Sequence, residues 1–330
     1  MYSAITCDVL RATVPPFVEC QQCTVNNRPE IPPRPAHLEG SMNHTRQLRE
    51  LIAAGTVPCP IVYNPLTAVI AREAGFPMVG VGGYALGANL MTAEPLLTLT
   101  ECVEHARRIV LAARVPVVVD AGAGFGSPVH AQRTVREFES AGIAGIHLED
   151  QVYPKRVHYH RGIEHIVPVQ EMVERIEAAV EARRDADFVI VARTDAMATD
   201  GYDEAIRRAH RYVEAGADLI YAWPNDLDEA RRVPRDVPAP TVYGVSEGNR
   251  LGRPRPSTAE LAEMGYSVVR NPHLATLTQY RAVQEALRHW RRTGRTSDEP
   301  AEMVRIRQEI EDVMGLDAHY ALERRTIEKS

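Results

Sequence analysis

The chain has 330 residues, of which 45% are hydrophobic and 25% charged, and its formal net charge is -6 at pH 7. This composition supports a large buried core in one or two domains, and the acidic balance without a basic stripe argues against nucleic acid as a partner. Since no run of about 18 apolar residues and no secretory leader pattern is present, we expect no membrane segment and a cytoplasmic location.

Residues 1–45 differ from the rest of the chain. They include the Pro-rich stretch NNRPEIPPRP and show no sustained hydrophobic period, so we expect an irregular N-terminal arm. Cys20 and Cys23 form a single CxxC pair there, but a closed zinc site needs four ligands and no second pair has suitable spacing. The odd total of five cysteines also argues against a disulfide framework.

From about residue 46, short apolar runs alternate with longer amphipathic stretches. The runs are rich in Val and Ile and show little polar alternation, which is typical of parallel strands buried on both faces. They cover residues 60–64, 78–83, 115–122, 145–150, 188–196, 219–223, 241–245 and 267–272.

The stretches between these runs carry helix signals. Ser257 or Thr258 fits a helix N-cap, and Gly142, Gly216 and Gly265 fit helix ends. Eight strands that are nearly all followed by helices predict a (β/α)8 TIM-type barrel over residues 46–278. The alternative, a doubly wound open sheet, would need a Gly-rich turn after its first strand, and the sequence has none there.

Residues 279–330 contain further helices beyond the predicted barrel. The segments RAVQEALRHWRR and AEMVRIRQEIEDVMG each have an apolar stripe, although no barrel strand is left for them to cover. We therefore expect these helices to pack on a partner subunit in a homo-oligomer, a dimer or a tetramer.

Two acidic residues close neighbouring strands of the predicted barrel. Functional residues of such barrels lie at the carboxyl ends of the strands, and Asp120 and Glu149 end the third and fourth strands. Two carboxylates together with water form an ordinary site for Mg²⁺ or Mn²⁺. In the alternative interpretation, one or both acids form a salt bridge with Arg193 or Lys155.

Other strand ends supply candidate substrate contacts. Arg193 is a lone charge after the run FVIV, and a guanidinium there is suited to bind a carboxylate bidentately. An internal ion pair between Arg193 and Glu149 is compatible with that role. The remaining predicted substrate-binding positions at strand ends are Tyr63, Asn64, Gly82, Gly83, Trp223 and Glu247.

The segment 151–168, which follows the fourth strand, is long for a connection without secondary structure. Such loops often act as lids over a site, and this one carries Lys155, His158 and His160, which could cover an anion and transfer protons. The alternative is an exposed basic loop that contacts a neighbouring subunit. Tyr159 has no role that the sequence assigns.

The stretch VPVVVDAGAGFGS, followed by RTVREFESAGIAGIHLEDQVYPKR and FVIVARTDA, resembles the isocitrate lyase and phosphoenolpyruvate mutase superfamily. The similarity runs over residues 46 to about 295, and it is nearest to methylisocitrate lyase-like and carboxyphosphonoenolpyruvate phosphonomutase-like members. The resemblance implies a (β/α)8 barrel, a C-terminal helix exchanged between subunits of a tetramer, and bound magnesium. It also implies small 2-oxo or 2-hydroxy acid substrates and cleavage of C–C or C–P bonds through a pyruvate-type enolate.

Residue by residue, the family pattern is kept in part. The motif Asp-Ala-Asp after the third strand reads Asp120, Ala121 and Gly122 here, so one metal-contacting acid of the family is missing. The resemblance assigns the fourth-strand acid to Glu149 and the carboxylate-binding arginine to Arg193.

Further departures affect the mouth of the barrel. Asn64 stands for a family Asp, Trp223 for a family Glu and Gly244 for a family Asn, whereas Glu247 matches. The lyase loop motif Lys-Lys/Arg-Cys-Gly-His reads KRVHYH from Lys155 here, and the valine in place of the cysteine has no transferable proton.

Three functions are therefore compatible with the sequence. The first is a lyase that acts on a small 2-oxo or 2-hydroxy acid through a metal-stabilised enolate, by C–C cleavage or decarboxylation without a catalytic cysteine. The second is a diverged enzyme with a bulkier substrate and no metal, or with phosphonomutase-like C–P chemistry. The third is a non-catalytic descendant that stabilises an assembly.

Overall fold

The computed structural model describes residues 43–328. The predicted N-terminal arm, with its Cys20 and Cys23 pair, therefore lies outside the described residues apart from its last three positions. The first described helix is α1 (His44–Ala54). None of the described helices is long and apolar enough to cross a membrane.

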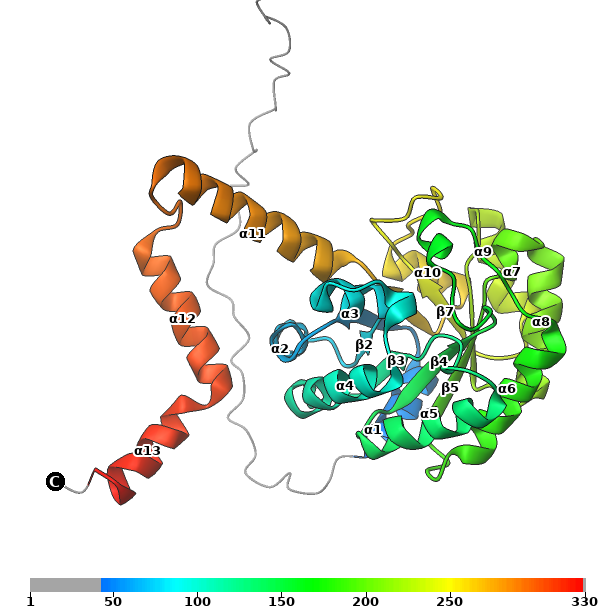
Figure 1. Cartoon of the computed structure of the whole chain (residues 1–330), viewed down its shortest axis with the longest axis horizontal. Helices are drawn as coiled ribbons and strands as arrows, with labels where there is room; N and C mark the ends of the chain where they lie inside the picture. The colour runs from blue at the N-terminus through cyan, green and yellow to red at the C-terminus, as the bar shows by residue number, and fades with distance from the viewer. Residues whose placement is uncertain (1–42, 329–330) are drawn as a thin grey trace, which may run out of the picture. The chain divides into compact units, whose positions relative to one another are not determined.

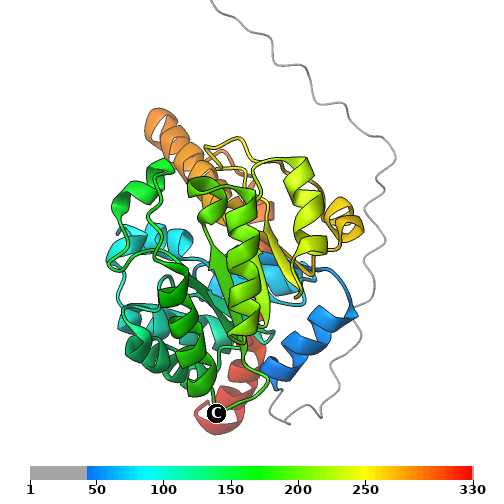
Figure 2. The same ribbon diagram turned by 90° about the vertical axis from the view of Figure 1, so that its right-hand side faces the viewer.

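Eight parallel strands close into a barrel in sequence order, with β1 paired to β8 (Figures 1 and 2). This closure confirms the predicted (β/α)8 fold and excludes the open sheet. Each predicted apolar run contains or overlaps one strand. The strands are β1 (Val57–Val62), β2 (Val79–Val81), β3 (Val117–Asp120), β4 (Gly145–Glu149), β5 (Val189–Thr194), β6 (Leu219–Ala222), β7 (Thr241–Gly244) and β8 (Val268–Asn271).

Helices surround the strands, and their ends follow local capping chemistry. Ser257 Oγ accepts a hydrogen bond from Glu260 N at 3.2 Å, and Glu260 Oε2 accepts one from Ser257 N at 2.8 Å, as the sequence predicted for this cap. The helices are α2 (Pro65–Glu73), α3 (Gly83–Leu90), α4 (Leu99–Ala113), α5 (Pro128–Ser140), α6 (Val169–Ala182), α7 (Ala196–Thr199), α8 (Tyr202–Glu214), α9 (Leu227–Asp236) and α10 (Thr258–Met264), with 3₁₀ turns η1 (Glu94–Leu96) and η2 (Val157–Arg161).

The strand register brings the candidate residues to one end of the barrel. Asp120 pairs with His147 across β3 and β4, and Glu149 pairs with Arg193 across β4 and β5. Because parallel strands present their carboxyl ends at the same rim, these side chains meet at the mouth.

Asp150, directly after Glu149, serves the opposite face of the sheet because successive side chains of an extended chain alternate. Its buried carboxylate accepts hydrogen bonds from Thr194 Oγ1 at 2.7 Å, Asp195 N at 3.0 Å and Tyr212 Oη at 2.9 Å. Arg208 Nη1 lies 3.3 Å from it. This network ties β4 to β5 and α8, so Asp150 has a structural role.

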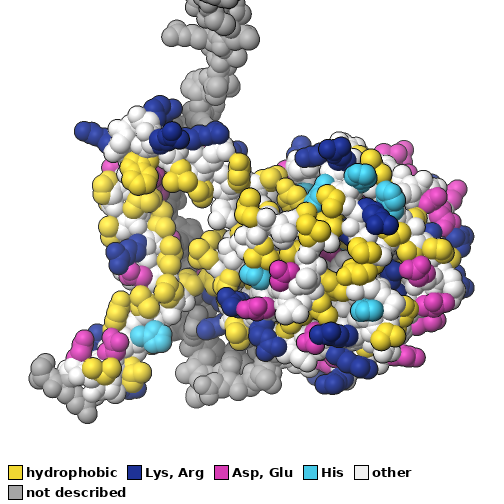
Figure 3. All heavy atoms as spheres, in the orientation of Figure 1, with side chains coloured by type: hydrophobic (Ala, Val, Ile, Leu, Met, Phe, Trp, Pro, Cys, Tyr) yellow, Lys and Arg dark blue, Asp and Glu magenta, His cyan; other side chains and the backbone are white. Residues whose placement is uncertain are grey.

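Three helices follow the barrel: α11 (Leu274–Thr293), α12 (Pro300–Met314) and α13 (Leu316–Thr326). α11 spans the predicted boundary between residues 278 and 279. None of the three helices contains a buried residue within the described chain, and hydrophobic side chains line them (Figure 3). Their exposed apolar residues include Tyr280, Val283, Leu287, Trp290, Val304, Met314 and Tyr320.

Candidate functional site

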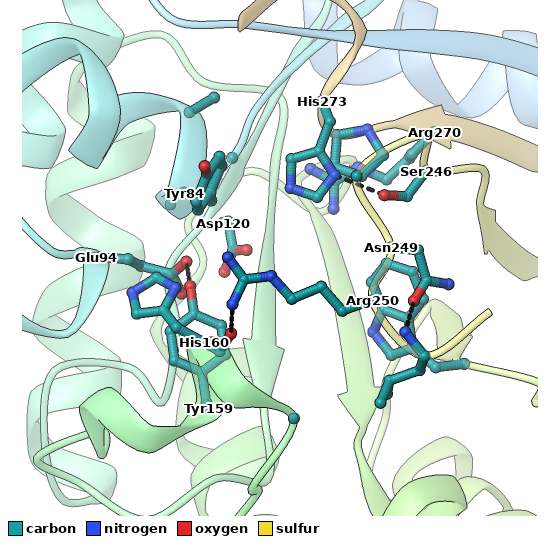
Figure 4. A pocket seen from close by; sticks show the side chains of 18 of the residues that line it. Tyr84, Glu94, Asp120, Tyr159, His160, Ser246, Asn249, Arg250, Arg270 and His273 are labelled. Carbon is teal, nitrogen blue, oxygen red and sulfur yellow. Dashed lines mark hydrogen bonds between the residues drawn. The ribbon is translucent and has the colours of Figure 1, made fainter. Parts of the chain in front are cut away.

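A cavity of ≈ 530 Å³ opens at the carboxyl ends of the strands (Figure 4). Residues at or after the carboxyl ends of β2 through β8 line it, together with residues of the long loop after β4. Trp223 forms part of its wall and does not fill the space. A Cβ at Gly244 would lie 2.5 Å from Trp223 Cζ3, so the large ring at position 223 requires the missing side chain at position 244.

Glu149 is the most enclosed acid of the mouth and is fully buried. Lys155 Nζ lies 2.9 Å from its Oε1, and Arg193 Nη1 lies 3.3 Å from its Oε2. Burial raises the pKa of Glu149 to about 7, although Lys155 and Arg193 act to lower it. Its Oε1 makes this ion pair with Lys155 but accepts no hydrogen bond of regular geometry from any described residue.

Asp120 stands beside this acid on the neighbouring strand. Its Oδ2 lies 3.9 Å from Arg193 Nη1, and its Oδ1 accepts a hydrogen bond from Gly122 N at 3.0 Å. Burial disfavours the charge on Asp120, but Arg193 and Lys155 outweigh this effect and lower its pKa to about 2. Asp120 is therefore ionised at neutral pH.

Arg193 is held by an acid that the sequence did not single out. Its Nε and Nη2 donate to Asp195 Oδ1 and Oδ2, both at 3.0 Å, in a bidentate pair. Nη1 remains on the side of Glu149 and Asp120. The predicted internal pair with Glu149 thus exists, and the guanidinium still offers Nη1 to the cavity, which it lines.

The loop after β4 covers the acids. Lys155 Nζ donates to Glu94 Oε1 at 2.6 Å, and Tyr159 Oη donates to Glu94 Oε2. Lys155 Nζ also lies 3.9 Å above the Tyr159 ring. On the other side, Arg250 Nη1 reaches across the cavity to the carbonyl of His160 at 3.3 Å (Figure 4). The loop is therefore fixed at both sides of the mouth, and it contains the short helix η2 where the sequence predicted no secondary structure.

The fit of a divalent cation rests on two features. Oε1 of Glu149 faces Gly122, since a Cβ there would lie 3.9 Å from this oxygen and meet nothing nearer. A small cavity of ≈ 40 Å³ adjoins Gly122, Asp120, Glu94 and Lys155.

Four acids and two cations meet here: Glu94, Asp120, Glu149 and Asp195 lie against Lys155 and Arg193. Arg270 also acts on Asp120. Residues 43–328 hold no group of three or more His, Cys, Asp or Glu side chains arranged to bind a metal. Asp120 and Glu149 are two carboxylates, the number that Mg²⁺ needs when it keeps several waters, so the chemistry of these donors fits this ion.

The structure brings together most, but not all, of the predicted site residues. Those that line the cavity or contact its acids are Gly82, Gly83, Asp120, Glu149, Lys155, His160, Arg193 and Trp223. His160 has a lowered pKa, chiefly because of burial.

Four predicted residues lie elsewhere. His158 is exposed and does not line the cavity. Tyr63 donates to Gln279 of α11 and lines a separate groove, and Asn64 caps α2 by accepting a hydrogen bond from Thr67 N at 2.9 Å. Glu247 Oε1 accepts a hydrogen bond from Asn271 at 2.8 Å and does not line the mouth.

Several residues of the site were missed by sequence reasoning. Asp195 follows Arg193 by two positions, a spacing that places both side chains on one face, so this pair carried a usable signal. Arg270 is a lone charge in the run VVRN, the same signal that marked Arg193. Glu94 had no such signal, because it lies in η1, well after the end of β2.

Comparisons with known proteins identify the family of this chain. The phosphoenolpyruvate phosphomutase family profile matches residues 48–291. The 2,3-dimethylmalate lyase of Eubacterium barkeri is 39% identical over 281 residues, which cover 84% of this chain and 96% of that protein.

Solved structures of the same family superpose on the barrel. A crystal structure of 2,3-dimethylmalate lyase superposes with a TM-score of 0.78 at 30% identity, covering 86% of this chain and 95% of the other. A phosphonopyruvate hydrolase in complex with oxalate and Mg²⁺ superposes with a TM-score of 0.76 at 29% identity, covering 87% and 100%. The chain therefore belongs to the phosphoenolpyruvate mutase and isocitrate lyase superfamily, whose lyases and mutases act on small carboxylic acids.

Proposed function

We propose that the chain is a divalent-cation-dependent lyase that cleaves a C–C bond of a small 2-oxo or 2-hydroxy acid without a cysteine. The observation that carries this proposal is the pair of neighbouring acids Asp120 and Glu149 at the carboxyl ends of β3 and β4, where Glu149 Oε1 lies opposite Gly122. Asp120 and Glu149 would hold Mg²⁺ or Mn²⁺. When bound, the cation supplies Lewis-acid stabilisation of the negative charge that develops on the substrate's 2-oxo oxygen. The oxalate and Mg²⁺ bound by the phosphonopyruvate hydrolase support this assignment.

The chain's own cations and amides position the carboxylate of the substrate. Arg193 Nη1 offers charge-assisted hydrogen bonds at the mouth, and its bidentate pair with Asp195 fixes its orientation. Gly82 and Gly83 open α3, where free N–H groups favour an anion. A Cβ at Gly83 would lie 2.5 Å from Glu94 Cδ, so glycine allows the helix start and this acid to approach each other.

Proton transfer is assigned to Tyr159 and Glu94, where the sequence had favoured Lys155, His158 and His160. Cleavage of a 2-hydroxy acid breaks the bond between C2 and C3: the 2-hydroxyl releases its proton to solvent and becomes the carbonyl of the 2-oxo acid product. The electron pair of the broken bond stays on C3 of the other fragment, and that carbon takes up a proton. Tyr159 lines the cavity and donates to Glu94, and burial followed by the charge of Glu94 raises its pKa, which keeps the phenol protonated. A protonated acid next to a carboxylate can deliver a proton and be restored.

The test follows release of a 2-oxo acid from candidate 2-hydroxy and 2-oxo diacids in the presence of Mg²⁺. Tyr159→Phe is expected to lower kcat by about 10²- to 10⁴-fold and to leave oxalate affinity unchanged, while His158→Ala, on the exposed side of the same turn, keeps wild-type kcat. If Tyr159→Phe keeps kcat and His160→Ala loses it, the proton donor is His160. If no diacid is cleaved under any metal condition, the lyase assignment fails.

We also propose that the catalytic barrel of residues 46–278 assembles into a homo-oligomer through residues 279–330. The apolar side chains exposed on α11, α12 and α13 support this proposal, because an apolar surface of this extent is unusual on a monomer. Light scattering of the full chain should give a dimer or tetramer, and a chain ending at residue 298 should shift toward monomer. A monomeric full chain would contradict this assembly.

A further inference from the structure

Two residues of the cavity that the proposed reaction does not use form a hydrogen-bonded pair. Ser246 follows β7 and His273 follows β8, and both line the cavity (Figure 4). Ser246 Oγ lies 2.6 Å from His273 Nδ1. Because β7 and β8 are neighbouring parallel strands, the segments that follow them meet at the same rim and bring this hydroxyl and this imidazole together.

The imidazole of His273 is held in place by its neighbours. Its ring meets the Tyr84 ring edge to face, with 4.9 Å between the two centroids. Gly248 packs against it, since a Cβ at this glycine would lie 3.3 Å from both Cγ and Nδ1 of the histidine. With Ser246 at Nδ1, the orientation of the ring is fixed, as a base that activates a neighbouring hydroxyl requires.

His273 is able to accept a proton. Burial lowers its pKa below the ordinary value of 6.5, and the charges of Glu247 and Glu94 oppose this effect only in part, so the ring is largely neutral at neutral pH. Its Nε2 makes no hydrogen bond with any residue of the described chain. When Nε2 carries the proton of the neutral ring, Nδ1 is the acceptor for the hydroxyl of Ser246.

A buried cation lies at the same end of the cavity. Arg270, near the end of β8, is only 4% exposed and lines the cavity with Ser246 and His273 (Figure 4). Val245 N, directly before the serine, donates to Arg270 O at 2.8 Å. Within residues 43–328, the guanidinium lies 2.7 Å from His147 Nδ1 but makes no ion pair, and its buried Nε has no partner. Such a group can stabilise negative charge that develops on a carbonyl oxygen.

A second serine–histidine pair of the chain has a different setting. Ser127 Oγ lies 2.9 Å from His130 Nδ1, but both residues are exposed, and this Nδ1 also accepts a hydrogen bond from Ser127 N at 3.2 Å. That pair caps the start of α5 and does not line the cavity. The side chain of His273 makes no capping hydrogen bond at the start of α11, so helix capping does not explain its contact with Ser246.

We propose that Ser246 and His273 are a nucleophile and base that hydrolyse small carboxylic esters, with Arg270 stabilising the oxyanion. This activity is separate from the proposed lyase reaction, and none of its steps involves a divalent cation. Acyl transfer needs a hydroxyl, a base within hydrogen-bond distance of it, and a positive charge for the tetrahedral intermediate, and these three residues supply them. A cavity of ≈ 530 Å³ is within the range of small-molecule sites.

The reaction has two halves. Ser246 Oγ attacks the carbonyl carbon of the ester and gives its proton to His273 Nδ1. The oxyanion collapses, the bond between the carbonyl carbon and the alcohol oxygen breaks, and that oxygen keeps the electron pair and takes the proton from His273. Water then attacks the acyl-serine and gives a proton to His273. The bond between the acyl carbon and Oγ breaks, and Oγ takes this proton back as the carboxylic acid leaves.

Labelling of the full chain with diisopropyl fluorophosphate tests the nucleophile. The reagent phosphorylates an activated serine and loses fluoride, and mass spectrometry of peptides locates the adduct. We expect one adduct per chain, on Ser246, at the same rate with and without EDTA. His273→Gln should lower the rates of labelling and of p-nitrophenyl acetate hydrolysis by about 10²- to 10⁴-fold, which is the usual contribution of a general base.

The matched control is Ser127→Ala, which removes the hydroxyl of the exposed pair and should keep both rates. Ser246→Ala should lose the adduct and the ester hydrolysis. If either cavity variant does not fold, the position of the adduct in the wild-type chain decides alone. The dyad is overturned by an adduct on Ser127, by the absence of any serine adduct, or by a labelling rate that His273→Gln leaves unchanged.

Discussion

Restoring a carboxylate at position 122 should strengthen metal binding. Gly122 has φ +51°, a conformation that Asp and Asn tolerate better than most residues, and a Cβ there meets only Glu149 Oε1 at 3.9 Å. The substitution Gly122→Asp would therefore place a third acid next to the atom that we assign to the cation.

The magnitude follows from Coulomb's law. Two unit charges about 4 Å apart attract each other by about 4 kcal/mol at an effective dielectric constant of about 20. Dehydration of the carboxylate and the cation offsets a large part of this attraction, and a net gain of about 1.4–3 kcal/mol corresponds to roughly ten- to hundredfold tighter binding. Backbone strain of about 1–2 kcal/mol is present with and without metal, so it lowers the metal-free Tm but cancels from the affinity.

Calorimetric titration with Mn²⁺ and Mg²⁺ measures this change. Gly122→Asn is the matched control, because it has the same shape and strain but no charge, and it should bind metal as the wild type does. The reasoning is refuted if Gly122→Asp binds metal no more tightly than wild type, or if Gly122→Asn gains equally.

Two further substitutions test the buried charges. Because the pKa of Glu164 is raised from 4.5 to about 9, the folded state holds a proton that the unfolded state releases, and stability is lost as pH rises between these values. Glu164→Gln has no such proton to lose. As pH rises, the free energy of unfolding of this variant should therefore increase relative to that of wild type, by at most about 1.4 kcal/mol per pH unit. Urea titrations at pH 5 and pH 8 measure this difference, and an equal difference at both pH values would contradict the prediction. Arg208→Met leaves Asp150 without its cation and should lower the free energy of unfolding by about 3–5 kcal/mol. The control Arg207→Met, at an exposed position, should leave the urea midpoint unchanged. Equal urea midpoints for the two variants would contradict the structural role of Asp150.

The sequence was sufficient for the barrel because each buried strand is a continuous Val- and Ile-rich run and each rim position follows from where that run ends. Asp120, Glu149 and Arg193 were found this way. Prediction from strand ends misses a side chain that reaches the mouth of the barrel from a connecting segment. Glu94 comes from η1, and its contact with Lys155 depends on how the segment after α3 packs.

Helix capping explains another misassignment. Asn64 follows β1, so its position at a strand end suggested a substrate contact, but its side chain accepts a hydrogen bond from Thr67 N at the start of α2. In this fold a residue just after a strand can also be the N-cap of the next helix, and an Asn there accepts a hydrogen bond from a free backbone N–H of the first helical turn. Glu149 and the next residue, Asp150, both follow the apolar run of β4, and the alternation of an extended chain sends their side chains to opposite faces, so only Glu149 reaches the mouth.

The central claim is that a divalent cation and a small carboxylate bind together at the acids of β3 and β4. A crystal grown with Mn²⁺ and oxalate tests this most directly, because anomalous scattering locates manganese. We predict an anomalous peak next to Glu149 Oε1 and Asp120, with oxalate between the metal and Arg193. A cavity that holds only water, or manganese bound away from these two acids, would contradict the account.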